Sequence, residues 1–343
     1  MRKISVIIPC YNVSLYIDRC MSSIVSQTIG IDCLEIICID DASTDDTWER
    51  LQKWEQLYPD HVVLFRQEMN RRQGAARNLG LSLSSADWIS FVDADDWLEP
   101  DFFEKLYEPV TKYACDVVAC EWIRDESEVL ACMDKSLRGS GQEQYIAVNT
   151  EDIRKSLLRS GILGDGIHAK LIRSGMLVDF EIFFPEDLTY EDMYWNPLLY
   201  VYATGVYVIK EYLYHYFVNP HATVMTRNET YHMDWVTVQM MKWADYHRRG
   251  LFESYREEME RDVLMNAACF VKLLIFRYDD PPFSFFQLER EFIRERVSDY
   301  ENNRYIEDYS ELYRFFLRML YSSINRTEFL EIVEQARKRW EIP

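Results

Sequence analysis

The sequence predicts an α/β protein, with a mostly parallel sheet flanked by helices and an α-helical region after it. Apolar runs typical of buried strands alternate with helical patterns from residue 4 to residue 98. This alternation favours parallel strands joined by helical crossovers. From about Trp235 onward only helical periodicity remains, with breaks such as Gly250 and Pro281-Pro282. We therefore expect two domains, residues 1–228 and residues 229–343.

The elements of the first domain follow from periodicity and from their end signals. The expected strands are 4–9, 34–39, 62–65, 88–92, 115–120, 180–184, 206–209 and 213–217, and the expected helices are about 14–25, 45–57, 69–83, 102–110 and 152–159. Ser14 is the expected N-cap of the first helix. The polar stretch 124–150, which contains Gly139-Ser140-Gly141, is expected to form a loop or lid.

Three carboxylates follow directly on the strand that begins at Trp88. In extended backbone Asp93 and Asp95 would point to the same side, with Asp96 turned away. Two like charges held this close raise each other's pKa unless a cation sits between them, and oxygen ligands suit Mg²⁺ or Mn²⁺. The alternative is a solvated acidic turn that caps the helix after Pro100.

Two more strands of the predicted sheet also end in polar residues. The first ends in Pro9-Cys10-Tyr11-Asn12 and the second in Asp40-Asp41. Ligands of such sheets bind beyond the carboxyl ends of the strands. Together with the carboxylates after Trp88, these ends predict a single site on one rim.

Composition narrows the class of protein. The 343 residues include 38 Lys and Arg against 58 Asp and Glu, a formal net charge of −20, so nucleic-acid binding is not expected. The eight Cys have no metal-type spacing and predict buried thiols in a reducing compartment. The first strand begins at once and the longest apolar run, 263–275, is too short to span a bilayer, so we expect a cytoplasmic protein.

Asp192 is a candidate for proton transfer or for helix capping. Thr189-x-x-Asp192 has the spacing of a capping box, and acidic residues favour the first turn of a helix. Pro197 would strain that helix shortly after its start. Both interpretations of Asp192 remain open at this point.

Taken together, five motifs resemble those of family 2 glycosyltransferases with the GT-A fold, over roughly residues 3–227. They are Ser5-Val6-Ile7-Ile8-Pro9-Cys10-Tyr11-Asn12, Cys38-Ile39-Asp40-Asp41-Ala42-Ser43-Thr44-Asp45, Gly74-Ala75-Ala76-Arg77-Asn78, Phe91-Val92-Asp93-Ala94-Asp95-Asp96 and Tyr190-Glu191-Asp192. Each is weak alone, but all five in this order and spacing form a strong signal. The tail after residue 230 lies outside the resemblance.

The resemblance implies a role for each matching residue. The nucleotide pocket would include Pro9, Tyr11, Asn12, Asp40 and Asp41, with Gly74 and Arg77 near the pyrophosphate or sugar, Asp93 at the donor and at the metal, Asp95 as the main metal ligand and Asp192 as the general base. Asp96 would support these groups from behind. The cofactor implied is Mn²⁺ or Mg²⁺.

The function expected from the resemblance is metal-dependent, inverting transfer of a sugar from a nucleotide diphosphate, such as a UDP-sugar, in cell-surface polysaccharide synthesis. The acceptor would be a hydroxyl of a glycan or a lipid-linked saccharide, handled in the cytoplasm or at the inner face of the membrane. One rival is a sugar-nucleotide-binding subunit without activity. Another is a sugar-phosphate nucleotidyltransferase, but Pro9-Cys10-Tyr11-Asn12 stands where its Gly-rich loop would be.

Several residues keep two interpretations. Lys170, His215 and His221 would touch substrate or be structural. The basic end Arg337-Lys338-Arg339-Trp340 would meet an anionic membrane surface or be a solvated helix end.

Overall fold

The computed structural model describes residues 2–127, 130, 132–139, 141–164, 166–219 and 229–340. The chain forms two compact units, Met1–Ala222 and Thr223–Pro343. We describe each unit by itself. The domain boundary expected after residue 228 falls next to a stretch outside the described residues.

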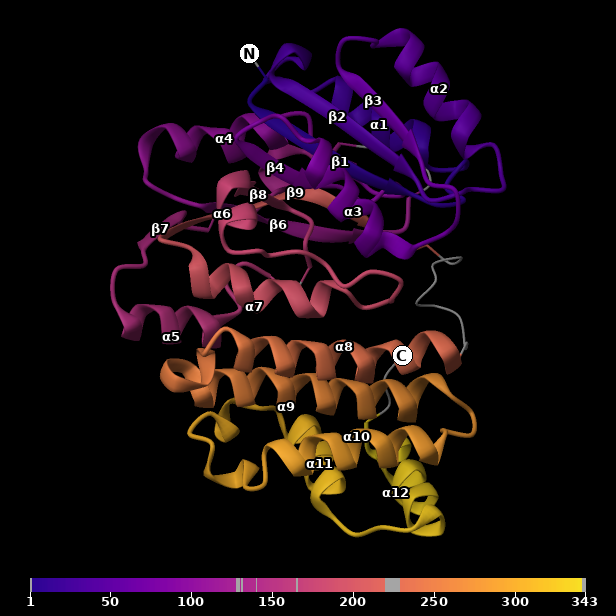
Figure 1. The fold of residues 1–343 in the computed structure, drawn as a ribbon, viewed down its shortest axis with the longest axis vertical. Helices are drawn as coiled ribbons and strands as arrows, with labels where there is room; N and C mark the ends of the chain where they lie inside the picture. Colours follow the sequence, from indigo (N-terminus) through magenta and orange to yellow (C-terminus); the bar gives the residue numbers. More distant parts are fainter. Residues whose placement is uncertain are drawn as a thin grey trace. The chain divides into compact units, whose positions relative to one another are not determined.

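The first unit is built on a nine-stranded sheet with the order β3-β2-β1-β4-β8-β6-β9-β5, in which β7 also pairs with β9 (Figure 1). The strands are β1 (Ile4–Cys10), β2 (Leu34–Asp40), β3 (Val62–Arg66), β4 (Trp88–Phe91), β5 (Trp97–Leu98), β6 (Val117–Asp125), β7 (Gln144–Ala147), β8 (Lys170–Arg173) and β9 (Gly205–Phe217). The first four strands are parallel, as the alternation predicts. The rest of the sheet is mixed, because β8 runs antiparallel between β4 and β6.

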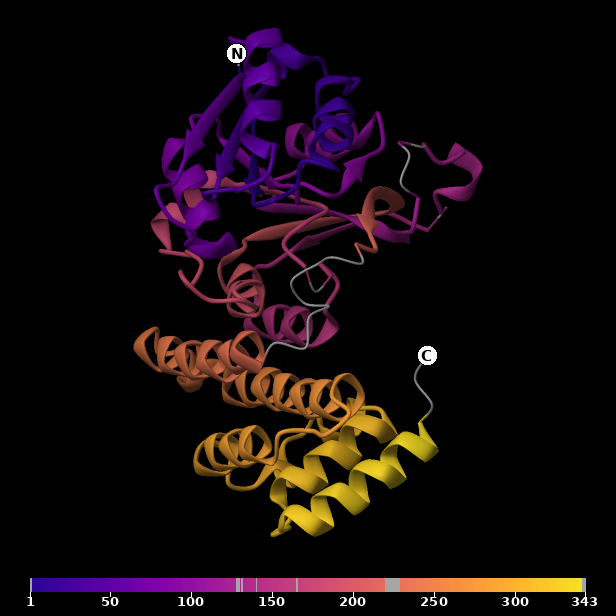
Figure 2. The same cartoon turned by 90° about the vertical axis from the view of Figure 1, so that its right-hand side faces the viewer.

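Helices cover both faces of this sheet (Figures 1 and 2). The helices of the first unit are α1 (Ile17–Val25), α2 (Thr47–Leu57), α3 (Arg72–Leu83), α4 (Phe102–Lys112), α5 (Glu151–Ser160), α6 (Ser174–Asp179) and α7 (Asp192–Tyr202). All seven residues of β1 and of β2 are buried, which is expected for parallel strands covered on both faces. The α/β class predicted from the sequence is confirmed.

The two faces are packed by different helices. Ile4, Val6 and Ile8 share a core with the buried side of α1 and with α4, whereas Ile37 and Ile39 pack against α3. Gly80 lets α3 approach β1, because a Cβ at this position would lie 2.4 Å from a methyl carbon of Ile7. This close approach packs the last part of α3 directly on the middle of β1.

Several expectations for single elements are wrong. Helix α1 begins at Ile17 with Tyr16 as its N-cap residue, so Ser14 does not cap it. Residues 180–184 form no strand, because the chain after α6 turns back through a hydrogen bond from the Ile182 N–H to the Leu177 carbonyl. The two strands expected at 206–217 form the single strand β9. The polar stretch 124–150 contains β7, which adds a strand to β9, rather than only a loop.

The second unit is helical in the part that the structure describes. Its helices are α8 (Glu229–Arg248), α9 (Leu251–Arg277), α10 (Phe283–Arg296), α11 (Glu311–Tyr321) and α12 (Arg326–Arg339). Buried polar groups pair inside it: the Gln239 amide donates to Glu289, and Lys242 forms an ion pair of 2.6 Å with Asp262. Among the described residues, no helix is long and apolar enough to cross a membrane.

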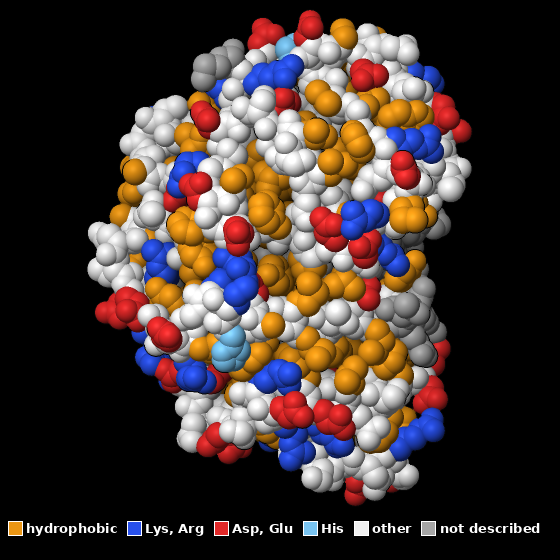
Figure 3. Space-filling model, in the orientation of Figure 1, with side chains coloured by type: hydrophobic (Ala, Val, Ile, Leu, Met, Phe, Trp, Pro, Cys, Tyr) orange, Lys and Arg blue, Asp and Glu red, His pale blue; other side chains and the backbone are white. Residues whose placement is uncertain are grey.

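The arginines of the basic stretch 337–340 have partners within the second unit. Arg337 donates to the Ile275 carbonyl at 2.8 Å, and Arg339 pairs with Glu311. These pairs favour a solvated helix end over a membrane-binding cluster. Acidic and basic side chains are also interspersed on the face drawn in Figure 3, with no extended basic field there.

Candidate active site

The first part of the site is the loop that leaves β1. Tyr11 is 45% exposed, whereas Pro9 lies buried in the strand. Asn12 has a φ of 52°, in the left-handed region that Asn tolerates better than most residues. Its side-chain oxygen accepts from the Thr44 N–H at 2.8 Å, and its own N–H donates to the Ser43 hydroxyl. The loops after β1 and β2 therefore hold each other, with the Tyr11 ring left exposed.

Two buried carboxylates follow β2. Asp41 accepts through Oδ1 from the Gln67 amide at 2.8 Å and from the Arg71 N–H at 2.7 Å. Asp40 forms an ion pair of 3.0 Å with Arg66. Burial raises the pKa of each carboxyl. The Asp41 carboxylate is thus fixed in direction beside the exposed Tyr11 loop, as recognition of a polar ligand edge requires.

The carboxylates after β4 gather by a turn and not by strand alternation. Strand β4 ends at Phe91, and the Asp96 N–H donates to the Asp93 carbonyl at 3.0 Å. Asp96 is buried and accepts from the Tyr214 hydroxyl and the Phe217 N–H, so it anchors the turn to β9. Burial and the neighbouring Asp95 raise its pKa.

Arg77 is the centre of the site. Its guanidinium is buried and donates to Asp93 Oδ1 at 2.8 Å and to Glu191 Oε1. It thereby joins α3 to the turn after β4 and to the start of α7. The resemblance implies a place for Arg77 near the pyrophosphate or sugar, and in the structure its guanidinium is the partner of Asp93.

The surroundings of Asp95 suit a bound cation. Burial, with help from the Asp93 charge, raises the pKa of its carboxyl to about 6, although the Asn219 amide donates to Oδ2 at 2.8 Å. A divalent cation beside Asp93 and Asp95 would relieve this repulsion, and carboxylate oxygens suit Mg²⁺ or Mn²⁺. Among the described residues, no group of three or more acidic, His or Cys side chains could hold a metal by itself. Asp93 and Asp95 would supply two oxygen ligands to such a cation.

Gly74 has a packing reason in this structure. A Cβ there would lie 2.0 Å from the Pro185 carbonyl oxygen, so only glycine lets the strand-like segment before Glu186 lie on α3. Asn78, one turn further along α3, exchanges hydrogen bonds of 2.9 Å with the backbone of Phe184. This docking brings the chain toward α7.

Asp192 is the first residue of α7, and its N-cap residue is Glu191, without a side-chain cap. The N-cap position therefore falls on Glu191 and not on Thr189, the residue that would begin a capping box. The chain enters the helix through Tyr190, whose φ of 63° is unusual for a bulky residue and is held by the surrounding contacts. Burial, Glu191 and Asp93 together raise the pKa of Asp192 to about 7, against the opposing effect of Arg77. A carboxyl with this pKa is suited to general-base catalysis near neutral pH.

Of the three residues left open, two have structural partners. Lys170 is buried and donates to the carbonyls of Gly166 and His168. His215 is buried with one ring nitrogen 2.9 Å from Glu99 and the other 3.0 Å from Asp125. Both therefore hold the fold around the site. His221 lies outside the described residues.

Three hydrogen-bond partners of the site residues were not predicted from the sequence, because only the fold brings them together. Glu191, Tyr214 and Asn219 each bond one of the carboxylates or Arg77. Glu191 could have been found from its place beside Asp192 in the same motif. Tyr214 and Asn219 carried no such signal, because they lie more than 115 residues from the carboxylates that they touch.

Comparison with known proteins shows the family of this chain. The model of the glycosyl transferase family 2 matches residues 5–177, half of the chain. The chain belongs to this family. It is thus a glycosyltransferase by family, and the motifs that carried the resemblance lie within the match or, for Asp192, shortly after it.

Curated relatives are similar over different shares of their length. The chain is 25% identical to EpsH of Bacillus subtilis over 268 residues, 77% of this chain and 75% of EpsH. It is 27% identical over 218 residues to the poly(ribitol-phosphate) beta-N-acetylglucosaminyltransferase TarS of Staphylococcus aureus, 63% of this chain and 35% of TarS. The match to the glycosyltransferase GlyA of Streptococcus pneumoniae is 39% identical but spans only 16% of GlyA.

Solved structures show the fold. TarS 1–349 of S. aureus in complex with UDP-GlcNAc has a TM-score of 0.55 at 18% identity, over 93% of this chain and 79% of TarS 1–349. The mannosyltransferase PcManGT of Pyrobaculum calidifontis, in complex with GDP-Man and Mn²⁺, has a TM-score of 0.53 at 15% identity, over 100% of this chain and 89% of PcManGT. The GT-A fold expected from the sequence is confirmed.

Replacement of Arg77 tests whether its buried charge holds the site together. We expect Arg77→Met to lower the free energy of unfolding by about 3–5 kcal/mol, because Asp93 and Glu191 would then be left without their shared partner. Urea unfolding followed by circular dichroism measures this loss.

The matched control is Arg71→Met, which removes an exposed guanidinium paired with Glu186 and Asp187. Exposed pairs add little to stability, so its unfolding midpoint should stay close to that of the parent chain. Equal losses for both variants would contradict the central role of Arg77.

Proposed function

We propose that this protein transfers a sugar from a UDP-sugar to a hydroxyl of a saccharide or polyol acceptor, with inversion at the anomeric carbon and with a divalent cation. The observation that carries the proposal is the position of Asp192. A carboxyl with a pKa of about 7 stands beside Asp93, within the field of the same guanidinium that holds the carboxylate turn. This position supports the assignment of base, donor carboxylate and cation-binding carboxylate to one site.

The donor would lie along the rim from β2 to β4. The fixed Asp41 carboxylate and the exposed Tyr11 ring suit the polar edge and the face of a nucleobase. Asn12 shapes the loop between them. The diphosphate would then reach the turn after β4, which is two strand positions away from β2 in the sheet order.

Asp95, with Asp93 beside it, would hold Mn²⁺ or Mg²⁺ together with oxygens of the diphosphate. When bound, the cation would supply positive charge against the charge that grows on the leaving group. This need explains why two carboxylates with few protein partners stand at a place where an anionic substrate must bind. The relatives leave the choice of ion open, although PcManGT was crystallised with Mn²⁺.

The transfer is a single displacement. The acceptor oxygen forms a bond to the anomeric carbon while the bond from that carbon to the diphosphate oxygen breaks, and the diphosphate leaves with the electron pair. The acceptor proton passes to the Asp192 carboxylate, which is ionised once the pH exceeds about 7. Attack opposite to the leaving group inverts the configuration.

The relatives suggest the class of acceptor. Two of them are named poly(ribitol-phosphate) beta-glucosyltransferase and poly(ribitol-phosphate) beta-N-acetylglucosaminyltransferase. We infer an acceptor of the same general kind, a hydroxyl on a cell-surface polymer or on its lipid-linked precursor, on the side of the membrane where nucleotide sugars are made. A subunit that only binds the donor would not need a carboxyl of raised pKa at Asp192, so catalysis is the better explanation.

Asp192→Asn tests the base. Transfer should fall by about 10²–10⁴-fold, because the amide cannot accept the acceptor proton, while UDP affinity stays the same. Transfer from a panel of UDP-sugars in the presence of Mn²⁺ measures the first effect, and calorimetric titration with UDP measures the second. Asp187→Asn, at an exposed position with a φ of 62°, is the matched control and should keep full activity.

The pH dependence provides a separate test of Asp192. In the parent chain, kcat/KM for the donor should rise with pH through about 7, because the free enzyme must lose the Asp192 proton. The raised pKa also means that ionising Asp192 costs stability, a cost that grows as pH rises from about 4 to about 7. Asp192→Asn should therefore unfold at an equal or higher temperature than the parent at pH 8, and a clear drop with activity intact would favour a capping role.

Asp95→Ala tests the cation site. The variant should fold, should lose metal-dependent transfer, and should no longer bind UDP more tightly when Mn²⁺ is added. Titration of UDP with and without Mn²⁺ gives the comparison. Asp32→Ala removes an exposed carboxylate before β2, at the opposite end of the strand from the site, and should leave the Mn²⁺ effect unchanged. An unchanged Mn²⁺ effect in Asp95→Ala would rule out this ligand.

A further inference from the structure

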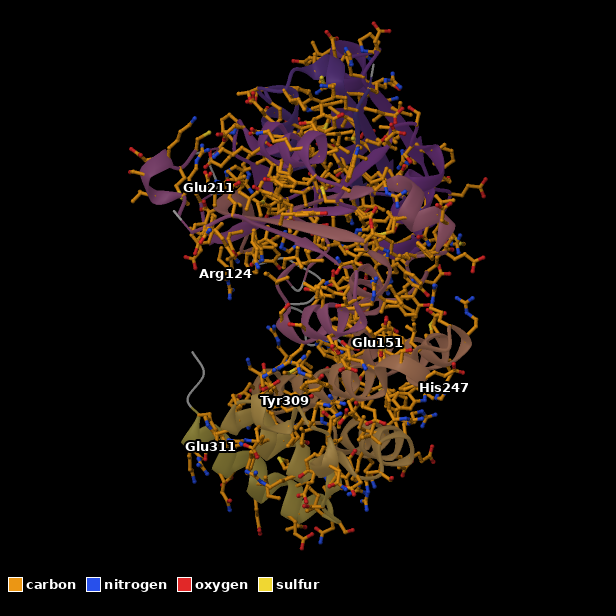
Figure 4. The ribbon with its side chains drawn as sticks, turned by 90° about the vertical axis from the view of Figure 1, so that its left-hand side faces the viewer. Arg124, Glu151, Glu211, His247, Tyr309 and Glu311 are labelled. Carbon is orange, nitrogen blue, oxygen red and sulfur yellow. The ribbon has the colours of Figure 1, made fainter. Side chains whose placement is uncertain are left out.

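An aromatic cluster lies on the rim beyond the carboxylate turn. Trp122 comes from the end of β6, Tyr214 and Tyr216 from the end of β9, and His168 from the segment that enters β8. The His168 ring stacks on Tyr214 with centroids 4.9 Å apart, and it meets the rings of Trp122 and Tyr216 at 5.4 and 5.7 Å. We call these four residues the aromatic wall. Arg124, labelled in Figure 4, follows two residues after Trp122 and marks this edge of the sheet.

The strand order sets the wall beside the reacting groups. Strand β8 is next to β4, and β6 is next to β8. Neighbouring strands lie about 4.8 Å apart, which is roughly the width of a sugar ring, so the wall begins about that far from the turn after β4. The strand directions agree, because β6 and β9 end, and β8 begins, on the rim where β4 ends. The electrostatics agree with a position near Asp93, because the Asp93 charge acts to raise the pKa of both His168 and Tyr216. The wall thus lies on the side of Asp93 away from the nucleotide residues.

His168 is buried with one ring nitrogen unused. Only 8% of the residue is exposed, and its Nε2 has no hydrogen-bond partner among the described residues. Leaving such a group unpaired costs about 1–3 kcal/mol of stability. Burial, then the Lys170 charge, lowers the pKa of His168 to about 4, so the ring is neutral at physiological pH and its Nε2 can pair with a hydroxyl.

The chain holds this ring in place with some strain. Gly166 makes room for it, because a Cβ there would lie 2.2 Å from His168 Cε1. Ala169 has a φ of 56°, which is unfavourable for a residue with a Cβ. The buried Lys170 then donates to the carbonyls on either side, of Gly166 and His168. Gly166, the left-handed backbone at Ala169 and the Lys170 hydrogen bonds together fix the position of the His168 ring, whose Nε2 has no partner among the described residues.

We propose that the aromatic wall binds a pyranose ring of the transfer reaction and that His168 Nε2 hydrogen-bonds one of its hydroxyl groups. The inference rests on the proposed function, since it assigns a sugar subsite to the same site. Pyranoses present C–H faces that pack on aromatic rings and hydroxyl edges that need hydrogen-bond partners. Trp122 and Tyr216 are both partly exposed and offer an aromatic face. His168 Nε2 is buried among these rings, so a hydroxyl would reach it only when a neighbouring side chain moves.

His215 differs from His168 in its partners. It lies two residues before the end of β9 and has a carboxylate on each ring nitrogen. His168 is also buried, but its Nε2 has no partner among the described residues. His61 Nδ1 has none either, so what distinguishes His168 is its place among the aromatic rings of the wall.

His168→Phe is the deciding variant, because phenylalanine keeps the ring stack and removes Nε2. Three quantities are measured on the full chain with Mn²⁺: affinity for UDP, affinity for UDP-GlcNAc, and binding of free N-acetylglucosamine and its β-methyl glycoside by ligand-observed NMR. We expect UDP affinity within about twofold of the parent. Sugar binding should weaken by about 3–10-fold, the range for one lost hydrogen bond.

The measurements separate the two sources of a pyranose. Loss of the extra affinity of UDP-GlcNAc over UDP assigns the wall to the donor sugar, whereas loss of free-saccharide binding assigns it to the acceptor. Gly166→Ala, which must displace the ring, should repeat the effect. His168→Gln, which restores a donor and an acceptor, should recover part of it. Thermal stability of His168→Phe should equal or exceed that of the parent, because an unpaired buried nitrogen is gone.

His61→Phe is the matched control. His61 lies just before β3, at the opposite end of the sheet from the rim, and the same substitution there should leave all three binding measurements unchanged. Unchanged sugar binding in His168→Phe, with lower thermal stability, would overturn the proposal and make His168 structural. Absence of UDP binding by the parent would instead refute the proposed donor, and the free-saccharide measurement would still decide the wall.

Discussion

A buried guanidinium organises the site. Arg77 comes from α3 and is buried. Its guanidinium donates to Asp93 on one side and to Glu191 on the other. Burying three ionic groups is costly unless they satisfy one another, so the turn after β4 and the entry to α7 cannot move independently. Because Asp192 follows Glu191, this one ion network also sets the distance between the base and the carboxylates that face the donor.

Arg77 and the carboxylates around it act in opposite directions on the pKa of Asp192. Arg77 lowers the pKa of Asp192, yet burial and two neighbouring carboxylates outweigh it, so the carboxyl titrates near neutral pH. The Asn219 hydrogen bond and the Arg19 charge both lower the pKa of Asp95, but burial outweighs them and leaves it at about 6. A site with so much negative charge and so few protein cations is prepared for a cation that arrives with an anionic substrate.

Two buried histidines in the mixed half of the sheet differ in their hydrogen-bond partners. His215 lies on one side of β9, stacked on Trp97 and held by two carboxylates. His168 lies against Tyr214, the neighbouring residue of the same strand, whose side chain points to the other side. Strand alternation thus separates His215, which is paired on both ring nitrogens, from His168, whose Nε2 has no partner among the described residues. Neither could be told from the other in the sequence.

The sequence by itself determined the parallel half of the sheet, the family and the identity of the carboxylates, since buried strands, polar strand ends and their order are local patterns. It did not determine how the groups meet. Asp93 and Asp95 come together through a turn, Asp96 through Tyr214, and Arg77 through Glu191, at separations of 118 and 114 residues for the last two. The strand expected at 180–184 failed for the same reason, because the docking of that segment on α3 at Gly74 outweighs its local β preference. Partners this far apart in the chain leave no trace in spacing, so only the tertiary structure could decide them.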